Sequence, residues 1–438
     1  MSDRLPAALR AYRLLSAGVG PLAPLLLAER KRRGKEHPAR LYERRGLARQ
    51  QRPRGPLVWI HGASVGELVS VLPLIARIAE RGFNVLVTTG TVTSAELAEQ
   101  RLPAGIIHQF VPLDVPHFVR RFLAHWRPDL ALFVESDLWP NRIVEAARRR
   151  IPMILINGRL SENSFRRWQR LPAAIVNLLQ RFDLCLARSS ADAERLGALG
   201  APRVVTGGDL KLDVPAPSCD PDKLAALRRA IGARPVIAAA STHEGEESAV
   251  IDAHARLRAD FPGLLTLIAP RHPERGGRVV ELAASAGLNA GLRTQGGLPD
   301  ANVDVYVANT VGELGLIYRL APVVFVGGSL VRHGGQNPIE PAKLGVAILH
   351  GPHVWNFAEL YAALDRNLGS ECVENLDRLA ARLGALLAQP EARERAAQAA
   401  RATVESLGGA LERTLQSLEP YLMQLRLGRR AGASANHA

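Results

Sequence analysis

Val326–Ala342 reads VGGSLVRHGGQNPIEPA and continues the apolar run PVVFVGG of Pro322–Gly328. A buried strand that leads into a glycine-rich loop is typical of α/β proteins, because glycine lets backbone N–H groups approach a ligand closely. Glu340 lies where the next helix is expected to begin, and a carboxylate there can accept both hydroxyls of a ribose. The stretch favours a nucleotide-sugar site, although many such loops bind nothing.

The same alternation of strand and helix patterns extends over most of the chain. Between the strands lie helical patterns such as Glu67–Arg81 and Ser94–Arg101. This βαβ rhythm predicts parallel sheets that are covered on both faces. Short runs rich in β-branched residues predict strands at Leu57–His61, Val85–Thr89, His108–Pro112, Leu130–Glu135, Met153–Asn157, Leu184–Ala187, Pro235–Ala240, Leu264–Pro270, Val303–Val307, Val323–Gly327 and Val346–His350.

The rhythm pauses once, at the proline-rich stretch VPAPSCDPD of Val214–Asp222. A chain of 438 residues is too long for one ordinary core, so we expect a linker near residue 217 with an open α/β domain on each side. The expected parts are an N-terminal segment 1–54, domains 55–216 and 217–425, and a disordered tail 426–438. The second domain includes closing helices. Ligands bind at the carboxyl ends of strands in such sheets, so two facing domains would form a central cleft.

The N-terminal segment is apolar and then strongly basic. Of the net charge of +14, the range Arg30–Arg54 holds +9, from eleven Arg or Lys and two Glu. Leu14–Ala28 carries no charge, but its fifteen residues are short for a membrane-spanning helix. This order favours association with an anionic membrane surface. The alternative is an ordinary core helix with a solvated basic flank. Few aromatic residues are available for base stacking, which argues against a nucleic-acid-binding function.

The sequence gives no sign of a metal or a bound cofactor. The three cysteines are widely spaced, and there is no P-loop motif. His243, His272 and His333 do not show the spacing of metal ligands, and Asp220 is better placed to cap a helix. We therefore expect neither cofactor nor metal.

Three charged residues in the first half are candidates for catalysis. Glu67 follows the strand of VWIHGASVGE in the first turn of the next helix. It either complements the helix dipole or acts as a general base, and a base there needs apolar or acidic neighbours to offset the dipole. Glu135, followed by Asp137, ends another strand in LFVESDLWPN, and Lys211 lies beside glycines in TGGDLKLD.

In the second half, polar loops follow successive strands. ASTHEGEE contributes Ser241 and His243 and occupies the usual position of a phosphate-binding loop. An arginine in the PRHPER loop can pair with a phosphate or carboxylate. The loop NTVGE (Asn309–Glu313) closes a further strand. Counting the loop that opened this section, four polar loops stand at strand ends, and together they predict a nucleotide-dependent activity. They contain the candidate donor-binding residues Pro270, Arg271, Val311, Gly312, Glu313, Asn337, Pro338, Ile339 and Glu340.

As a set, the motifs resemble those of the 3-deoxy-D-manno-octulosonic acid (Kdo) transferases, the glycosyltransferases that modify lipid A. The resemblance covers nearly the whole chain and is highly specific. It rests on GKEHPARLYERRG (Gly34–Gly46), HGASVGE (His61–Glu67), ESDLWPN (Glu135–Asn141), STHEGEE (Ser241–Glu247), PRHPER (Pro270–Arg275), VGE (Val311–Glu313), GGSLVRHGGQNPIEPA (Gly327–Ala342) and GPHVWNF (Gly351–Phe357).

The resemblance implies a GT-B fold and metal-independent, inverting transfer of Kdo from CMP-Kdo to the lipid A precursor lipid IVA. It implies that Glu67 is the base, that Glu135 and Lys211 hold charge in the transition state, and that the second-half loops hold CMP. It also implies a place on the cytoplasmic face of the bacterial inner membrane, in contact with anionic lipids. The alternative within the same fold is a UDP-sugar transferase or epimerase.

Overall fold

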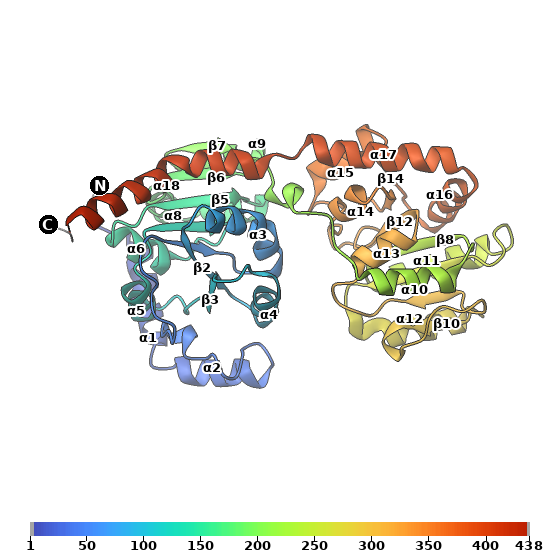
Figure 1. The fold of residues 1–438 in the computed structure, drawn as a ribbon, viewed down its shortest axis with the longest axis horizontal. Coiled ribbons are helices and arrows are strands. Elements are labelled where there is room, and N and C mark those ends of the chain that lie inside the picture. Colours follow the sequence, from blue (N-terminus) through green and yellow to red (C-terminus); the bar gives the residue numbers. More distant parts are fainter. Residues whose placement is uncertain (1–3, 436–438) are drawn as a thin grey trace. The chain divides into compact units, whose positions relative to one another are not determined.

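The computed structural model describes residues 4–435, which form two compact units (Figure 1). The N-terminal unit takes in the chain up to Val214 and again from Gly408, and the C-terminal unit is Pro215–Leu407. The division falls in the proline-rich stretch, two residues before the expected start at 217.

The N-terminal unit is built on one parallel sheet with the strand order β3-β2-β1-β4-β5-β6-β7. Its strands are β1 (Leu57–His61), β2 (Asn84–Thr89), β3 (Ile107–Phe110), β4 (Leu130–Val134), β5 (Met153–Gly158), β6 (Leu184–Ala187) and β7 (Val204–Thr206). Its helices are α1 (Ala7–Val19), α2 (Ala23–Arg32), η1 (Glu43–Arg45), α3 (Val65–Glu80), α4 (Val92–Arg101), α5 (Pro116–Trp126), α6 (Pro140–Arg148), α7 (Glu162–Gln169), α8 (Pro172–Leu179), α9 (Ser190–Ala198), η2 (Leu210–Asp213) and α18 (Ala410–Ala435).

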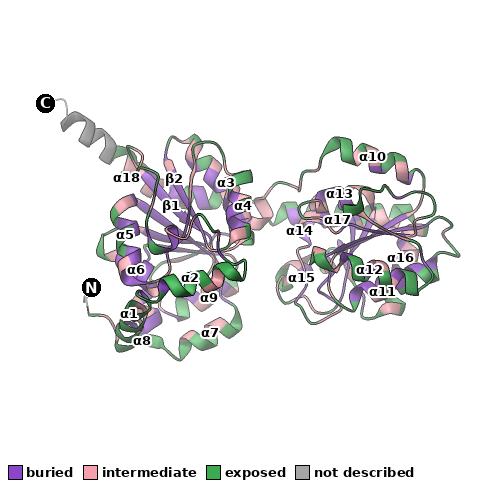
Figure 2. Ribbon diagram, turned by 90° about the horizontal axis from the view of Figure 1, so that it is seen from below, coloured by how far each residue is buried: buried purple, intermediate pink, exposed green. Residues whose placement is uncertain are grey.

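Both faces of this sheet are buried, which explains why its strands read as continuous apolar runs. Leu57 and Trp59 of β1 enter a core shared with α5, α6 and α8, whereas Val58 and Ile60 enter a second core shared with α3 and α18. Figure 2 shows the strands as buried and the outer sides of the helices as exposed. This is the doubly wound arrangement that the βαβ rhythm predicts.

The C-terminal unit repeats the plan with the strand order β10-β11-β9-β8-β12-β13-β14. Its strands are β8 (Val236–Thr242), β9 (Leu265–Pro270), β10 (Ala290–Leu292), β11 (Val305–Val307), β12 (Val323–Val326), β13 (Ala347–His350) and β14 (Ser370–Cys372). Its helices are α10 (Pro221–Ile231), α11 (Glu246–Leu257), η3 (Pro273–Arg275), α12 (Gly276–Ser285), η4 (Arg293–Gln295), α13 (Leu314–Leu320), α14 (Ile339–Lys343), α15 (Ala358–Arg366), α16 (Leu376–Ala388) and α17 (Pro390–Ser406).

The last helix corrects two expectations. Helix α18 belongs to the N-terminal unit, not to the second domain, because Leu415, Leu418 and Leu422 are buried in the core that also contains α3. The helix also continues to Ala435, so the expectation of disorder is wrong for residues 426–435. Residues 436–438 of the expected tail and residues 1–3 of the N-terminal segment lie outside the described residues.

Some arginines of the basic segment are bound within the folded N-terminal unit. Arg44 is buried, forms an ion pair with Glu36 at 3.1 Å and donates to the Val111 carbonyl at 2.7 Å. Arg40 pairs with Glu43, whose carboxylate also accepts the Phe110 N–H at 2.7 Å. These arginines attach the segment to the loop and strand around β3, so the whole +9 range does not form one solvated basic face.

Helices α1 and α2 make up the apolar N-terminal segment, and they bend by 72° between them. Within residues 4–435 no single helix has the length and apolar composition to cross a membrane, and this bent pair meets that test only when its two helices are taken together.

Candidate active site

The candidate residues gather where each sheet reverses its strand order. In the N-terminal unit the chain runs from β1 outward to β2 and β3 and then returns to place β4 on the other side of β1. In the C-terminal unit β8 and β12 are the corresponding neighbours. Loops after such a pair of strands diverge and leave a crevice, which is where open α/β sheets bind ligands.

Glu67 lies in the first turn of α3, directly after β1. Ser64 caps the helix, and the Glu67 carboxylate accepts hydrogen bonds from the Ala63 N–H at 2.6 Å and the Ser64 hydroxyl at 3.1 Å. Burial and the neighbouring charges of Glu135 and Asp137 outweigh these bonds and raise the pKa of Glu67 to about 7. The carboxylate therefore has a capping role, and it also has the offsetting neighbourhood that a general base needs near neutral pH.

Glu135 and Lys211 form a close ion pair beside Glu67. The Lys211 Nζ lies 2.7 Å from the Glu135 Oε1, and both side chains are mostly buried. Glu135 follows β4 with φ +58°, a left-handed conformation that is uncommon for non-glycine residues. Asn157, at the end of β5 with φ +51°, accepts the Leu210 N–H at 3.0 Å and so fixes the start of η2, which carries Lys211. The structure thus brings the three predicted catalytic residues into one group.

Asp137 belongs to a buried network that the sequence does not reveal. Its carboxylate contacts the His61 ring and lies 2.8 Å from the Arg142 guanidinium. Burial opposes its ionisation, but Arg142 and His61 outweigh burial and hold the pKa of Asp137 well below its usual range. Burial lowers the pKa of His61, which favours a neutral ring. The network thus places a lasting negative charge near Glu67.

In the C-terminal unit the glycine-rich loop after β12 packs directly on the loop after β8. A side chain at Gly327 would lie 2.7 Å from the Ser241 carbonyl, so only glycine allows this approach. The N–H groups of Gly328, Ser329 and Leu330 all donate to the buried carboxylate of Glu246, at 2.6, 2.9 and 2.9 Å. The expectation that these N–H groups face a ligand is therefore wrong for these three, because a carboxylate of the protein occupies them.

His243 and Ser241 lie in the loop after β8. The His243 ring stacks on His333 with 4.1 Å between the ring centres, and its Nε2 lies 3.1 Å from the Gln336 amide nitrogen. Ser241 has φ +57°. Arg271, directly after Pro270 at the end of β9, has an exposed side chain, and its N–H donates to the Thr242 carbonyl at 2.9 Å. These predicted donor residues therefore share one edge of the sheet.

In the VGE loop, the side chain of Glu313 is bound by other residues of the protein. Val311 is 85% exposed and Gly312 has φ +83°, but the Glu313 carboxylate is already bound by Arg293 and Lys223. The hydrogen bond from Arg293 is the main reason that the pKa of Glu313 falls to about 2. Glu313 thus holds the Arg293 loop in place through its side chain, and donor binding by this loop stays a prediction.

The start of α14 carries the remaining predicted residues. Asn337 caps this turn by accepting the Ile339 N–H at 3.0 Å, and Pro338 stands at the N-cap. Burial raises the pKa of Glu340, while a hydrogen bond from Asn337 opposes the rise. Within the described residues, no group of three or more His, Cys, Asp or Glu side chains is arranged to hold a metal ion.

Two parallel sheets, each with polar loops at its switch point, define the class of two-domain α/β enzymes with the GT-B fold. A solved structure of a putative UDP-N-acetylglucosamine 2-epimerase from Listeria monocytogenes shares this fold with a TM-score of 0.59. It is 14% identical and covers 84% of this chain and 97% of that chain.

Sequence relatives narrow the class to one family. The family model described as 3-deoxy-D-manno-octulosonic-acid transferase (kdotransferase) matches residues 39–214. The 3-deoxy-D-manno-octulosonic acid transferase of Bordetella pertussis is 37% identical over 94% of this chain and 99% of that protein. The enzyme of the same name from Haemophilus influenzae is 34% identical over 91% and 94%. The chain belongs to the Kdo transferase family.

Proposed function

We propose that this protein transfers Kdo from CMP-Kdo to the lipid A precursor lipid IVA, with inversion at the anomeric carbon and Glu67 as the general base. Membership of the family supports the assignment of Kdo as the transferred sugar. The observation that carries the mechanism is the Glu67 carboxyl, whose pKa is raised to about 7 beside the Glu135–Lys211 pair. A base with such a pKa accepts a proton efficiently near neutral pH.

In this mechanism Glu67 takes the proton of an acceptor hydroxyl. The hydroxyl oxygen forms a bond to the anomeric carbon of Kdo from the face opposite CMP. The bond between that carbon and the phosphate oxygen breaks, and CMP leaves with the electron pair. Lys211 and Glu135 present fixed opposite charges 2.7 Å apart, which suits them to stabilise charge that develops in the transition state.

The donor site in this proposal is the loop edge of the C-terminal unit. Arg271 is exposed and positively charged beside His243, which suits an anionic phosphate or carboxylate. Glu340 is the carboxyl available to the ribose hydroxyls, with Asn337, Pro338 and Ile339 fixing its turn. Pro270 and the Val311–Gly312 turn complete the proposed contacts, and Glu313 acts through Arg293.

Product analysis tests this function. Incubation with CMP-Kdo and lipid IVA in the presence of EDTA should give products heavier by one or more Kdo units in mass spectrometry. NMR of the product should show the anomeric configuration inverted relative to the donor. Thermal stabilisation by UDP and not by CMP, with no mass increment, would instead favour the UDP-sugar alternative.

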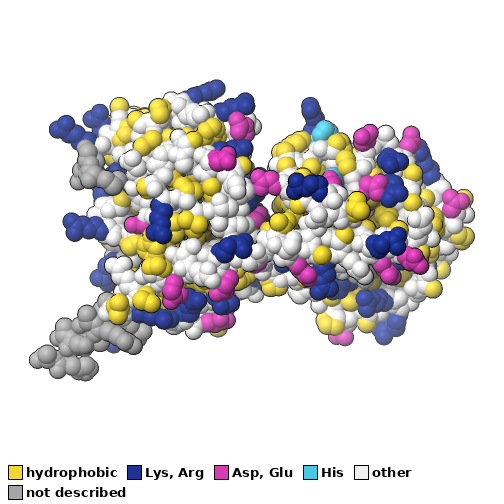
Figure 3. Space-filling model, turned by 90° about the horizontal axis from the view of Figure 1, so that it is seen from above, with side chains coloured by type: hydrophobic (Ala, Val, Ile, Leu, Met, Phe, Trp, Pro, Cys, Tyr) yellow, Lys and Arg dark blue, Asp and Glu magenta, His cyan; other side chains and the backbone are white. Residues whose placement is uncertain are grey.

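We also propose that the enzyme works at the cytoplasmic face of the bacterial inner membrane, through α2. This helix is exposed along most of its length in Figure 2. It presents Leu22, Leu25 and Leu26 to solvent, next to the exposed Lys31 and Arg32. Apolar side chains beside basic ones suit an anionic lipid surface. The face of the N-terminal unit seen in Figure 3 also carries apolar patches, with both basic and acidic side chains scattered among them.

A single charge on α2 tests this placement. Leu25 is 71% exposed, so Leu25→Asp should leave the fold intact. If Leu25 enters the lipid, the variant should bind vesicles containing phosphatidylglycerol at least about tenfold more weakly in sedimentation assays. Leu368→Asp, at an exposed leucine of the C-terminal unit, is the matched control and should bind as the wild type does. Equal binding by all three proteins would rule out α2 as the contact.

A further inference from the structure

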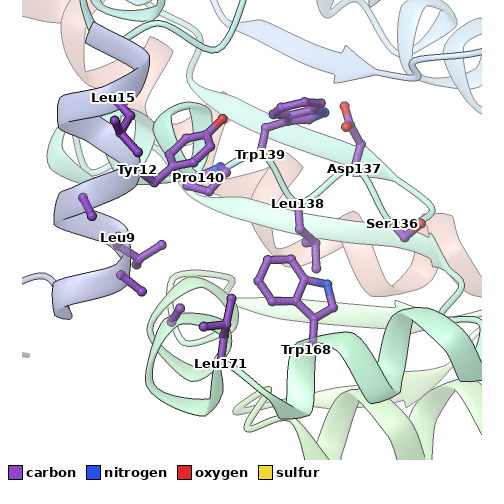
Figure 4. Close-up of a pocket in the computed structure, with 13 residues that line it drawn as sticks. Leu9, Tyr12, Leu15, Ser136, Asp137, Leu138, Trp139, Pro140, Trp168 and Leu171 are labelled. Carbon is purple, nitrogen blue, oxygen red and sulfur yellow. The ribbon is translucent and has the colours of Figure 1, made fainter. Parts of the chain in front are cut away.

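A cavity of about 610 Å³ lies beside the candidate catalytic group in the N-terminal unit (Figure 4). Helix α1 forms one wall, the loop after β4 forms a second, and α7 with the start of α8 forms a third. The side chains that matter here are Leu9, Tyr12, Leu15, Trp139, Trp168 and Leu171. A volume of this size lies within the range of about 300–1,000 Å³ that ligand pockets occupy.

The walls of the cavity leave no uncompensated charge inside it. The Asp137 carboxylate is bound by His61 and Arg142, and the Tyr12 hydroxyl donates to Asp114 at 2.9 Å. The remaining lining is almost wholly aliphatic or aromatic. A ligand that fills this cavity therefore needs to be apolar, and a hydrocarbon chain fits that requirement.

Helix α1 is fixed in position as a wall of this cavity. Arg13 pairs with Glu145 of α6 at 2.6 Å, and Asn141 donates to Ser16 at 2.9 Å. These polar bonds hold one side of α1 on α6, while the side that carries Tyr12 and Leu15 lines the cavity (Figure 4). The cavity is thus part of the folded unit and does not depend on a loosely attached helix.

The position of the cavity links it to catalysis. Ser136 and Asp137 line it, and they directly follow Glu135, which pairs with Lys211. A chain held in the cavity would therefore end next to the loop that carries Glu135, where the acceptor hydroxyl has to be placed for the proposed reaction.

Two exposed arginines are close in sequence to the third wall of the cavity. Arg167 directly precedes the lining residue Trp168, and Arg170 directly precedes the lining residue Leu171. Neither arginine forms an ion pair with another residue in the range 4–435. An apolar cavity with arginines close to one of its walls suits an anionic amphiphile whose chain enters the cavity.

We propose that this cavity binds a fatty acyl chain of the acceptor and thereby positions the acceptor sugar at Glu67 and Glu135. The proposal rests on the proposed function, because it names where the lipid part of that acceptor is held. Each methylene that the cavity removes from water should strengthen binding roughly fourfold, so the length of the chain matters.

Binding of cis-parinarate, a fluorescent fatty acid, tests the cavity directly in the full chain. Leu15 and Leu14 are neighbours on α1 and both are 75% exposed, but only Leu15 lines the cavity. We expect saturable binding to the wild type and to Leu14→Asp, and binding at least tenfold weaker to Leu15→Asp and Leu171→Asp. Circular dichroism verifies that each variant is folded. Absence of saturable binding to the wild type, or equal binding to all four proteins, would overturn the proposal.

A second measurement distinguishes the acceptor's chain from other lipids. The ratio of kcat/KM for lipid IVA to that for its deacylated disaccharide should fall at least tenfold in Leu15→Asp and stay unchanged in Leu14→Asp. If Leu15→Asp loses parinarate but keeps the ratio, the cavity holds a different lipid and the acceptor assignment is wrong. If parinarate binding differs among the four proteins as expected but the wild type transfers Kdo to neither acceptor, the proposed function is wrong, while the acyl-binding cavity is still supported.

Discussion

At the scale of single residues, the ionisation of Glu67 is set by opposing influences. The Ala63 N–H and the Ser64 hydroxyl stabilise its charged form, whereas burial and the charges of Glu135 and Asp137 destabilise it. The second group prevails, and the pKa rises to about 7. Arg142 and His61 keep Asp137 ionised, and the Asp137 charge helps to raise the pKa of Glu67. The residues that bind Asp137 therefore also influence the ionisation of the base.

A change at Glu135 tests this setting. Glu135→Gln removes a negative charge near Glu67, so the pKa of Glu67 should fall. The base is active when deprotonated, and the rate therefore drops as the pH falls through that pKa. In the wild type this drop should be centred near pH 7, and in Glu135→Gln it should move to lower pH, whatever the loss in maximal rate. A pH profile of kcat/KM measures the shift, and an unmoved acidic limb would show that Glu135 does not act on the base.

The sequence places Glu67, Glu135 and Lys211 at strand ends, and the structure groups them. It does not reveal Arg142 or His61, because an arginine within a helix and a histidine in a buried strand look like ordinary residues until the fold brings them to Asp137. The sequence does not reveal the role of Glu246 for a similar reason, because an acid in the first turn of a helix is expected only to interact with the helix dipole. Its four backbone donors come from two loops that are more than eighty residues apart.

At the scale of elements, the carboxylate of Glu246 makes the glycine-rich loop and the start of α11 into one structure. Its oxygens accept the N–H of His243 at 2.9 Å and three N–H groups of the loop after β12. The proposed donor edge contains both loops, so its shape depends on this buried acid.

Replacing that acid tests its role as a positioning residue. Glu246→Gln sets an amide NH₂ against backbone N–H groups, and each donor left without an acceptor costs about 1–3 kcal/mol. We expect a lower free energy of unfolding for the C-terminal unit and a weaker affinity for CMP in calorimetric titrations. Glu244→Gln is the control, because the Glu244 side chain is 88% exposed, and it should change neither quantity. Unchanged CMP affinity in Glu246→Gln would show that the loop does not contribute to donor binding.

The strands show which elements sequence patterns can predict. All eleven expected strands are present, with ends that differ by up to two residues. The three strands that the sequence does not predict are β7, β10 and β14, and each is a three-residue strand at the edge of its sheet. An edge strand pairs on one side only and needs no continuous apolar run, so it gives little signal.

At the scale of the whole molecule, the chain returns to its first unit at the end. Helix α18 closes the N-terminal unit after the C-terminal unit is complete, so the N-terminal core depends on residues at both ends of the sequence. The pattern of the sequence predicts the helix but not its partner, because an apolar stripe does not specify which core buries it.

Two substitutions in α18 test this connection. Leu418 is fully buried against the N-terminal core, so Leu418→Ala should lower the free energy of unfolding by about 2–5 kcal/mol. Met423, 53% exposed on the same helix, is the control, and Met423→Ala should change it by less than about 0.5 kcal/mol. Urea unfolding followed by tryptophan fluorescence reports mainly on the N-terminal unit, which contains every tryptophan except Trp355. Equal stability of both variants would mean that α18 does not support that unit.

The central claim is that Glu67 is the base for Kdo transfer, and the pH dependence of transfer by Glu67→Gln tests it most directly. A glutamine can still accept the Ala63 N–H, so the variant should fold and bind CMP as the wild type does. We predict that transfer from CMP-Kdo to lipid IVA falls by about 10²–10⁴-fold and that the acidic limb near pH 7 disappears. A folded Glu67→Gln enzyme that transfers Kdo at the wild-type rate, with the same acidic limb, would contradict the account.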